Sequence, residues 1–397
     1  MHIPSERVSD EMRSEQASLW IVPANEGKEI AVLIKAPTPS LKAIISGCKI
    51  EILIGLKETI LCSGVRIYDA PGSPLLVSGV QRYREEHIAL SRLLTEKSSP
   101  IFLFNEMDIC IGWSSLLIDS KAAKNFESLI LDANRLYTGP FDSKASHILD
   151  CFCFTFDKTV SYENTSDIPV ASMEPEVEEW HSTDNLFIGL KESQSIQLND
   201  KDEGEIFERA IWASLESVFP FTLYKSPIVE IGESQRELTD VLAFHEYGSF
   251  LIEAKDLSIL DSGFNRTIER RVKGVQKQAR KAIKQLVGSS KALKRGERIF
   301  DAQGKEIKPE RMNPVHCIVL VTELGHSGDW SDVEKDLIKA VKETNNFFHV
   351  FDLREFIMIL KGSFGRPELV DYNLIERFKV FLSKRSVHIR SQHAPNK

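Results

Sequence analysis

Cysteine is scarce in this chain and follows no recognisable pattern. Among 397 residues there are six cysteines, and none forms a CxxC pair or lies beside a cluster of histidines. Such spacing argues against a zinc site and against a framework of disulfides. It suits a reducing compartment, so we expect a cytoplasmic protein.

Targeting signals and long apolar runs are also missing. The opening MHIPSERVSDEMRSEQ lacks the order of basic and then apolar residues that marks a secretory signal. No apolar run approaches the roughly 20 residues that a membrane-spanning helix needs. We therefore expect no membrane partner.

Charge is distributed unevenly along an otherwise ordinary globular composition. Hydrophobic residues make up 42% and charged residues 27%, and the formal net charge is −8, so the whole molecule is no general binder of polyanions. Acids dominate residues 157–205, whereas 266–298 is basic and contains only Glu269 and Glu297 as acids. The length allows two or three domains.

The N-terminal part alternates strand-like and helical runs. Strands are predicted at KEIAVLIKA, KIEILIGL, SPLLVSG and PIFLFNEMDICIGW, and helices at QRYREEHIALSRLLTEK and SKAAKNFESLILDANRL. No glycine-rich phosphate loop and no G-x-S-x-G elbow occurs there. We predict a mixed α/β or α+β domain over 1–156 that recognises a target, senses a signal or mediates assembly, as a homo-oligomer or with a partner protein.

Two segments are predicted to hold little regular structure. Residues 157–203, with YENTSDIPVASMEPEVEEW, are polar and acidic and predict a linker that holds one short ordered piece at NLFIGL. Residues 386–397 predict a frayed tail.

The segment 204–385 has a clear order of elements. A helix at EIFERAIWASLESVF precedes a strand-like FTLYKSPIVEI and two strands, ELTDVLAF and SFLIEAK, which HEYG separates. A helix over 264–287, a strand at HCIVLVTEL, a helix at SDVEKDLIKAVKET and the run FHVFDLREFIMIL follow. The predicted order is α-β-β-β-α-β, followed by a further helix and strand.

Three charged residues interrupt the two strands around HEYG. If the hairpin is centred in the middle of HEYG, Asp240 and Glu253 lie directly opposite each other, with Cβ atoms about 4.5–5.5 Å apart. Lys255 then shares the face of Glu253. Gly248 is expected to supply the positive φ of the turn, although a bulge there would shift the register by one residue.

Two buried carboxylates facing each other require compensation. Like charges in opposed positions destabilise a sheet, and burying them costs about several kcal/mol. Mg²⁺ or Mn²⁺ would offer that compensation through hard oxygen ligands, and Lys255 could orient a water or stabilise charge on a phosphate. The alternative is that Lys255 simply neutralises one carboxylate in a partly exposed ion pair.

These residues resemble the motif of the PD-(D/E)XK nuclease superfamily, which has the restriction-endonuclease-like fold. The resemblance covers about residues 204–360 and rests on Asp240 and on the triplet Glu253-Ala254-Lys255, held on consecutive strands after a helix. The helix opening GEIFERA is similar to the Mrr-type and NERD-like branch. Thr239 stands where the family often has proline.

The resemblance implies a nuclease that depends on Mg²⁺ or Mn²⁺. Asp240, Glu253 and the Ala254 carbonyl would bind the metal, joined by a glutamate of the preceding helix, and Lys255 would assist hydrolysis of a phosphodiester. DNA is favoured over RNA because that branch mostly cuts DNA, and a role in prokaryotic restriction or anti-phage defence is implied by analogy alone. The alternative is a catalytically silent nuclease-fold module for nucleic-acid binding or assembly.

Which helix glutamate joins the metal site is open between Glu205 and Glu208. Helical spacing predicts a buried stripe that Glu208 flanks, whereas Glu205 lies further toward solvent. We favour Glu208, with a solvated helix charge as the alternative.

The helix over 264–287 is predicted to carry one apolar and one cationic face. The cationic face would bind phosphates beside the metal site. Its candidate nucleic-acid contacts, together with a helix glutamine of the kind that related nucleases often carry, are Arg266, Arg270, Lys273, Gln276, Lys277, Arg280, Lys281 and Lys284. His245 and His316 are expected to have solvent or packing roles.

Overall fold

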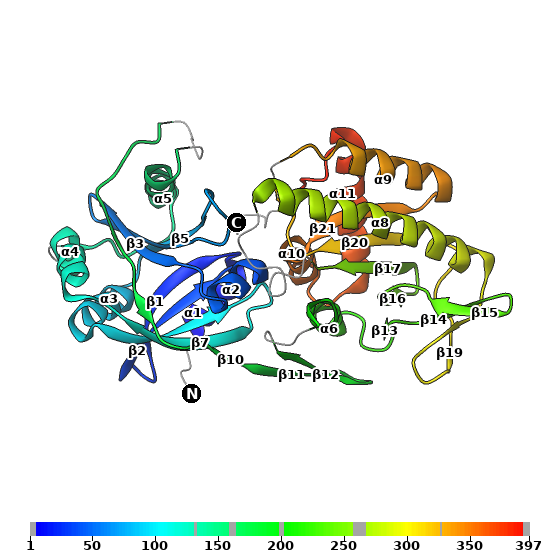
Figure 1. Cartoon of the computed structure of the whole chain (residues 1–397), viewed down its shortest axis with the longest axis horizontal. Helices are drawn as coiled ribbons and strands as arrows, with labels where there is room; N and C mark the ends of the chain where they lie inside the picture. The colour runs from blue at the N-terminus through cyan, green and yellow to red at the C-terminus, as the bar shows by residue number, and fades with distance from the viewer. Residues whose placement is uncertain are drawn as a thin grey trace. The chain divides into compact units, whose positions relative to one another are not determined.

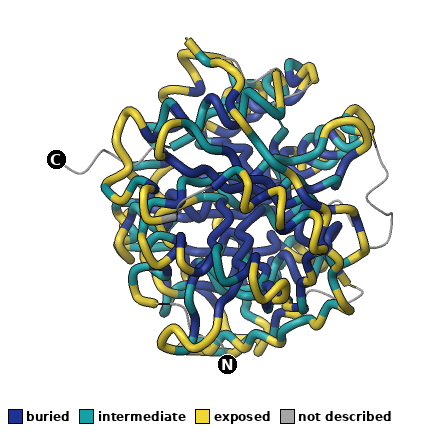
Figure 2. Tube along the Cα trace, turned by 90° about the vertical axis from the view of Figure 1, so that its left-hand side faces the viewer, coloured by how far each residue is buried: buried dark blue, intermediate teal, exposed yellow. Residues whose placement is uncertain are grey.

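The computed structural model describes residues 5–130, 133–158, 164–197, 202–256, 267–325 and 328–391. These residues divide into two units, one reaching Thr183 and the other starting at Asp184 (Figure 1). Buried residues concentrate in the interior and exposed residues on the turns (Figure 2). Helices and sheets are mixed in both units, which confirms the expected α/β class. Within the described ranges, no helix combines the length and apolarity needed to cross a bilayer.

The first unit holds two sheets. The strands of one follow the order β1-β2-β6-β7-β10, and β9 also pairs with β7. The strands of the other follow the order β5-β4-β3-β8. The strands are β1 (Ser18–Ala24), β2 (Glu29–Lys35), β3 (Ile50–Lys57), β4 (Ile60–Ile67), β5 (Leu75–Gln81), β6 (Ser98–Phe104) and β7 (Cys110–Leu117). The helices are α1 (Glu6–Ser14), α2 (Thr38–Ile45), α3 (Arg84–Glu96), α4 (Ser120–Ile130) and α5 (Ser143–Phe156).

Helix α5 is absent from the sequence-based prediction. Its aromatic and cysteine residues have weak helix propensity, so the pattern gives little signal. The helix begins at a capping residue, because the Asp142 carboxylate accepts a hydrogen bond from the Ala145 N–H at 2.8 Å.

The acidic stretch predicted as a linker contains short strands instead. β8 (Val170–Met173) pairs with β3, and β9 (Glu176–Val177) and β10 (His181–Ser182) pair with β7. β11 (Asp184–Ile188) and β12 (Ser193–Gln197) form a hairpin in the second unit. Backbone hydrogen bonds hold such edge strands, so their side chains can stay polar and give no apolar signal.

The second unit is built on a five-stranded sheet in the order β13-β16-β17-β20-β21. β13, β16 and β17 are antiparallel neighbours, whereas β17, β20 and β21 run parallel. These strands are β13 (Leu223–Lys225), β16 (Val241–His245), β17 (Gly248–Lys255), β20 (His316–Val321) and β21 (Phe347–Asp352). A separate small sheet contains β14 (Ile228–Ile231), β15 (Ser234–Glu237), β18 (Ile299–Phe300) and β19 (Glu306–Ile307). The helices are α6 (Glu203–Glu216), α8 (Ile268–Arg295), α9 (Ser331–Thr344), α10 (Leu353–Ser363) and α11 (Pro367–Lys384).

One face of this sheet packs against α8 and α9. Leu242 of β16 and Leu251 of β17 belong to the same apolar core as the buried side of those two helices. Because side chains alternate along a strand, Glu253 and Lys255 share the face of Leu251. Asp240, directly before β16, is two residues from Leu242. The charged residues therefore belong to the α8 side of the sheet.

The hairpin register predicted from the sequence is confirmed. Val241 pairs with Ile252 and His245 with Gly248, so the turn lies in the middle of HEYG without a bulge. The expected role of Gly248 is wrong, because its φ is not positive. A Cβ at this position would lie 3.0 Å from Nε2 of His245, so a larger residue would require the His245 side chain to shift by a few tenths of an ångström.

Helix α8 is longer than the predicted 264–287. It starts after the N-cap Thr267 and ends at Gly296, which has a φ of 82°. The helix continues past residue 287 because Ala292 and Leu293 extend its buried stripe.

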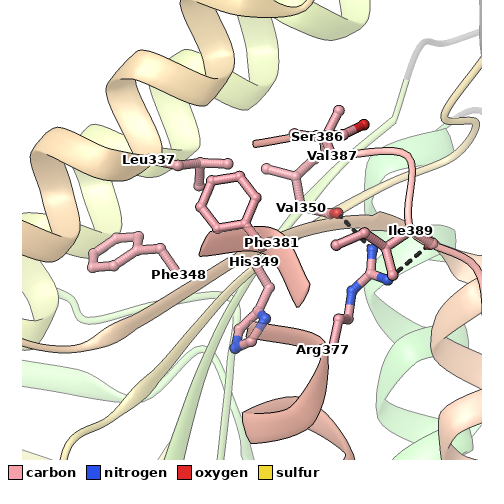
Figure 3. A pocket seen from close by; sticks show the side chains of 9 residues that line it. All are labelled: Leu337, Phe348, His349, Val350, Arg377, Phe381, Ser386, Val387 and Ile389. Carbon is pink, nitrogen blue, oxygen red and sulfur yellow. Dashed lines mark hydrogen bonds between the residues drawn. The ribbon is translucent and has the colours of Figure 1, made fainter. Parts of the chain in front are cut away.

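The predicted tail is ordered as far as it is described. Val387 is buried, and Arg377 of α11 donates to the Ile389 carbonyl at 2.7 Å. Arg390 binds both carboxylate oxygens of Asp352 at 2.8 Å. Figure 3 shows the small cavity that this segment closes, with Arg377 between β21 and the segment. Residues 392–397 lie outside the described ranges.

Candidate active site

Asp240, Glu253 and Lys255 converge on the α8 side of the sheet. The Lys255 ammonium donates to Oε2 of Glu253 at 2.8 Å and to Oδ2 of Asp240 at 3.4 Å. The same Asp240 oxygen accepts the backbone N–H of Ala254 at 2.6 Å. Thr239, directly before Asp240, donates to the Ile252 carbonyl at 2.7 Å, which ties this corner to β17. The backbone therefore holds Asp240 beside the triplet that follows it on the next strand.

The carboxylates of Asp240 and Glu253 are both buried and share the ammonium of Lys255. Glu253 is 2% exposed and Asp240 is 9% exposed. Burial, followed by the neighbouring charge of Asp240, raises the pKa of Glu253 to about 7, although Lys255 pulls it down. The pKa of Lys255 is itself raised, since the attraction of the two carboxylates outweighs the effect of its burial. One ammonium does not offset two buried negative charges.

The two candidate glutamates of α6 lie in different surroundings. Glu205 forms ion pairs with Lys225 and, at 3.1 Å, with Arg209. Burial raises its pKa, but these cations outweigh burial and the net pKa is lowered. Burial raises the pKa of Glu208 to about 7, and the charge of Asp240 is the next cause. Glu208 is therefore the helix carboxylate whose charge is coupled to the site.

Glu237 belongs to this electrostatic group, and the sequence analysis missed it. It ends β15, three residues before Asp240, in the stretch RELTD. Although Glu237 as a whole residue is exposed, partial burial of its carboxylate raises its pKa, and Asp240 contributes in the same direction. Its place directly before a candidate catalytic aspartate was the available signal.

The donor set suits a hard divalent cation. Asp240, Glu253 and Glu208 offer carboxylate oxygens. Burial first, and the charge of Asp240 second, raise the pKa of Glu208 and of Glu253 to about 7. A cation of charge two would lower those pKa values and free Lys255 from holding both carboxylates. As the side chains are placed, no three His, Cys, Asp or Glu groups converge tightly enough to hold a metal within the described part of the chain.

Most of the predicted cationic residues of α8 point into solvent. Arg266 lies outside the described residues. No hydrogen bond or ion pair links the following exposed side chains to another described residue: Arg270, Lys273, Lys277, Lys281 and Lys284. We call these five residues the α8 row.

Two residues predicted for the same face contact α9 and the loop before it. Arg280 forms an ion pair with Asp336 at 2.6 Å, and Gln276 donates to the Asp329 carbonyl at 2.9 Å. On the other flank of α8, Ser289 donates to the Leu238 carbonyl. The flank that carries Gln276 therefore faces α9, and the opposite flank faces the segment that leads to Asp240.

A second buried polar cluster lies on the other face of the sheet. His316 of β20 contacts Nε2 of His349 through its Nδ1 at 3.1 Å and Oδ1 of Asp371 through its Nε2 at 2.7 Å. Its ring stacks between those of Phe250 and Phe347, with centroids 5.2 and 4.9 Å away. Burial lowers the pKa of both histidines. The packing role expected for His316 is consistent with this position.

Comparison of the chain with protein-family models, with curated proteins and with solved structures gives no match.

Proposed function

We propose that the protein is a metal-dependent nuclease that hydrolyses phosphodiester bonds, with DNA as the favoured substrate. The observation that carries this proposal is the meeting of Asp240 and Glu253, both buried, on a single lysine. Excess buried negative charge is unfavourable for folding unless a ligand offsets it.

The order of elements supports the same proposal. Helix α6 precedes β13, β16 and β17, and α8 and β20 follow them. Apart from the small sheet of β14–β15 and β18–β19, this order is similar to the α-β-β-β-α-β order of the restriction-endonuclease-like core. The parallel pairing of β17 with β20 also suits that core.

Each residue has a role that follows from its position. Asp240, Glu253 and the Ala254 carbonyl would hold Mg²⁺ or Mn²⁺, and Glu208 would add a third carboxylate. The cation supplies Lewis-acid chemistry for phosphodiester hydrolysis. Lys255 would keep its positive charge beside the phosphate as negative charge builds there. The α8 row would bind phosphates that flank the scissile bond.

Cleavage assays test this proposal. The parent protein, Asp240→Ala and Lys255→Ala are incubated with plasmid, linear duplex, single-stranded DNA and RNA, with and without Mn²⁺. Lys379→Ala on α11 is a matched control, since Lys379 is exposed and its one ion pair with a described residue is with the neighbouring Glu376 at 2.6 Å. We expect Mn²⁺-dependent cleavage by the parent and the control only. Unchanged cleavage by Asp240→Ala or Lys255→Ala would show that this mechanism is wrong.

A second candidate function is a nuclease-fold module that binds nucleic acid without cutting it. The observation that favours it is the contact of Lys255 with both carboxylates, which partly neutralises them. Calorimetry separates the two candidates. Binding of Mn²⁺ that Glu253→Ala abolishes favours the nuclease, whereas no binding at millimolar Mg²⁺ or Mn²⁺ favours the module.

A further inference from the structure

Helices α8 and α9 run parallel and side by side (Figure 1). Residues that come later on α8 contact residues that come later in the α9 segment. Gln276 contacts the Asp329 carbonyl at 2.9 Å, Arg280 contacts Asp336 at 2.6 Å, and Lys291 contacts Glu343 at 2.5 Å. At a rise of 1.5 Å per residue, they span about 22 Å of α8. The pair thus forms one continuous outer layer on the sheet.

Acids of α9 pair with cations of α8. Asp336 and Glu343 form ion pairs with Arg280 and Lys291. The acids of the first turn, Asp332 and Glu334, lie near the lysines of α9 instead. Lys335, Lys339 and Lys342 recur every three or four residues, are all exposed, and share one face away from the buried core stripe.

An open groove beside α9 gathers these lysines with one more cation. Arg385, directly after α11, lines the groove together with Lys335, Lys339 and Lys342. Ile338 forms part of its floor and Glu334 is its acidic lining residue. We call the four cations the α9 row.

The acids near the α9 row do not cancel it. Asp332 already contacts Lys335 at 3.2 Å and Arg280 at 3.6 Å. No hydrogen bond or ion pair joins Lys339 or Lys342 to another side chain in the described part of the molecule. Lys339 and Lys342 are therefore exposed and without an ion pair among the described residues, although Glu343 attracts Lys339 through space.

We infer that the α8 and α9 rows together bind the two phosphate backbones of a nucleic-acid duplex, an inference that rests on the proposed nuclease function. Packed helices lie about 8–10 Å apart, which is comparable to the roughly 6–12 Å widths of the grooves that separate the two backbones of B-DNA. A single strand has one row of phosphates and would engage one row of cations. The presence of two rows of cations therefore favours a duplex as the substrate class.

The direction of α8 connects this surface to the candidate site. Ser289 of α8 contacts the Leu238 carbonyl, two residues before Asp240. Lys284, the last member of the α8 row, lies five residues earlier on the helix. A duplex bound along the rows would run past the segment that positions Asp240.

Binding measurements in chelator, where a metal-dependent enzyme cannot cut, test the inference. Fluorescence anisotropy of a labelled 24-base-pair DNA duplex and of one of its strands compares the parent with Lys339→Gln/Lys342→Gln. The control is Lys121→Gln/Lys124→Gln on α4, a pair with the same spacing and exposure in the first unit. Thermal melting confirms that both variants fold.

We expect the α9 variant to bind duplex roughly three- to tenfold more weakly at about 0.1 M salt, with a slope of log K against log salt that falls by about 1.8. Single-strand binding should change little, and the control should match the parent. Unchanged duplex binding, or equal losses for duplex and single strand, would overturn the inference. So would lysine-dependent binding to phosphatidylserine vesicles in place of duplex. Cleavage with Mn²⁺ is assayed separately, so failure of the nuclease proposal can be distinguished from failure of the duplex-binding inference.

Discussion

The two faces of the five-stranded sheet each bury a polar cluster, but only one cluster is balanced. On the face away from α8, His316, His349 and Asp371 share hydrogen bonds, and the lowered pKa values keep the histidines neutral. On the α8 face, Asp240 and Glu253 share one lysine, and the pKa of Glu253 is raised. Balanced burial stabilises the fold, whereas unbalanced burial of charge marks a candidate ligand site.

The largest expected effect comes from Glu253→Gln. We expect Mn²⁺-dependent cleavage to fall about 10²–10³-fold, while the free energy of unfolding at pH 8 rises by about 1–3 kcal/mol. The sign follows from the raised pKa. Folded Glu253 holds its proton up to about pH 7 and the unfolded side chain only to about 4.5, so stability falls as pH rises through that window. Glutamine removes this loss.

Glu355→Gln is the matched control for that substitution. Glu355 is equally buried, but it accepts hydrogen bonds from the backbone and hydroxyl of Ser391 at 2.9 and 2.6 Å and faces Arg377. We expect Glu355→Gln to lower the free energy of unfolding by about 1–3 kcal/mol and to leave cleavage per folded molecule unchanged. Urea unfolding measures the change in the free energy of unfolding for Glu253→Gln and for Glu355→Gln. If both changes had the same sign, the distinction between unbalanced and balanced buried carboxylates would be wrong.

The next effect is a pH dependence of metal binding. Glu208 and Glu253 both have pKa values raised to about 7, and each must lose its proton to bind a cation. Affinity for Mn²⁺ should therefore rise by up to about 100-fold between pH 6 and pH 8, and by about tenfold in Glu208→Gln. Calorimetry in buffers of different ionisation enthalpy counts the released protons. An affinity that is flat across this range would exclude both glutamates as ligands.

The smallest effect is expected on the balanced face. His349→Phe leaves Nδ1 of His316 without its partner and should lower the free energy of unfolding by about 1–3 kcal/mol at pH 8. Cleavage per folded molecule should not change. The parent should lose stability as pH falls below about 6.5, because unfolded histidines take up protons that the folded ones resist. Urea titrations at pH 5.5 and 8 should show that the free energy of unfolding falls less with pH in His349→Phe than in the parent. An equal or larger fall in the variant would contradict the neutral state of the buried histidines.

The sequence predicted the hairpin that carries the site because strand alternation is a strong local signal. The register follows from the symmetry of HEYG, and it places Val241 opposite Ile252 as observed. The same rule put Lys255 on the face of Glu253. Contacts between distant segments could not be predicted from the sequence. Helical spacing places Arg280 and Gln276 on the same face as the exposed cations, and only the position of α9 shows that both are in contact with it or with the loop before it.

Other differences also arise from contacts that a local pattern does not reveal. The strands within 157–203 are held by backbone pairing with β3 and β7, which polar side chains do not reveal. Glu237 was missed because its carboxylate matters through the nearby charge of Asp240. The preference for Glu208 over Glu205 came from helical spacing alone. The ion pair of Glu205 with Lys225 joins α6 to β13, and helical spacing does not reveal it.

The docking of Arg390 onto Asp352 has a consequence for synthesis on the ribosome. Asp352 ends β21 and caps α10, yet the guanidinium that satisfies it belongs to a segment translated 38 residues later. A nascent chain that has reached only Lys384 would hold Asp352 and Glu355 without Arg390 and Ser391. The second unit thus completes its packing only after residue 391 has been synthesised, and a chain cut at Lys384 should be an early target for chaperones and proteases.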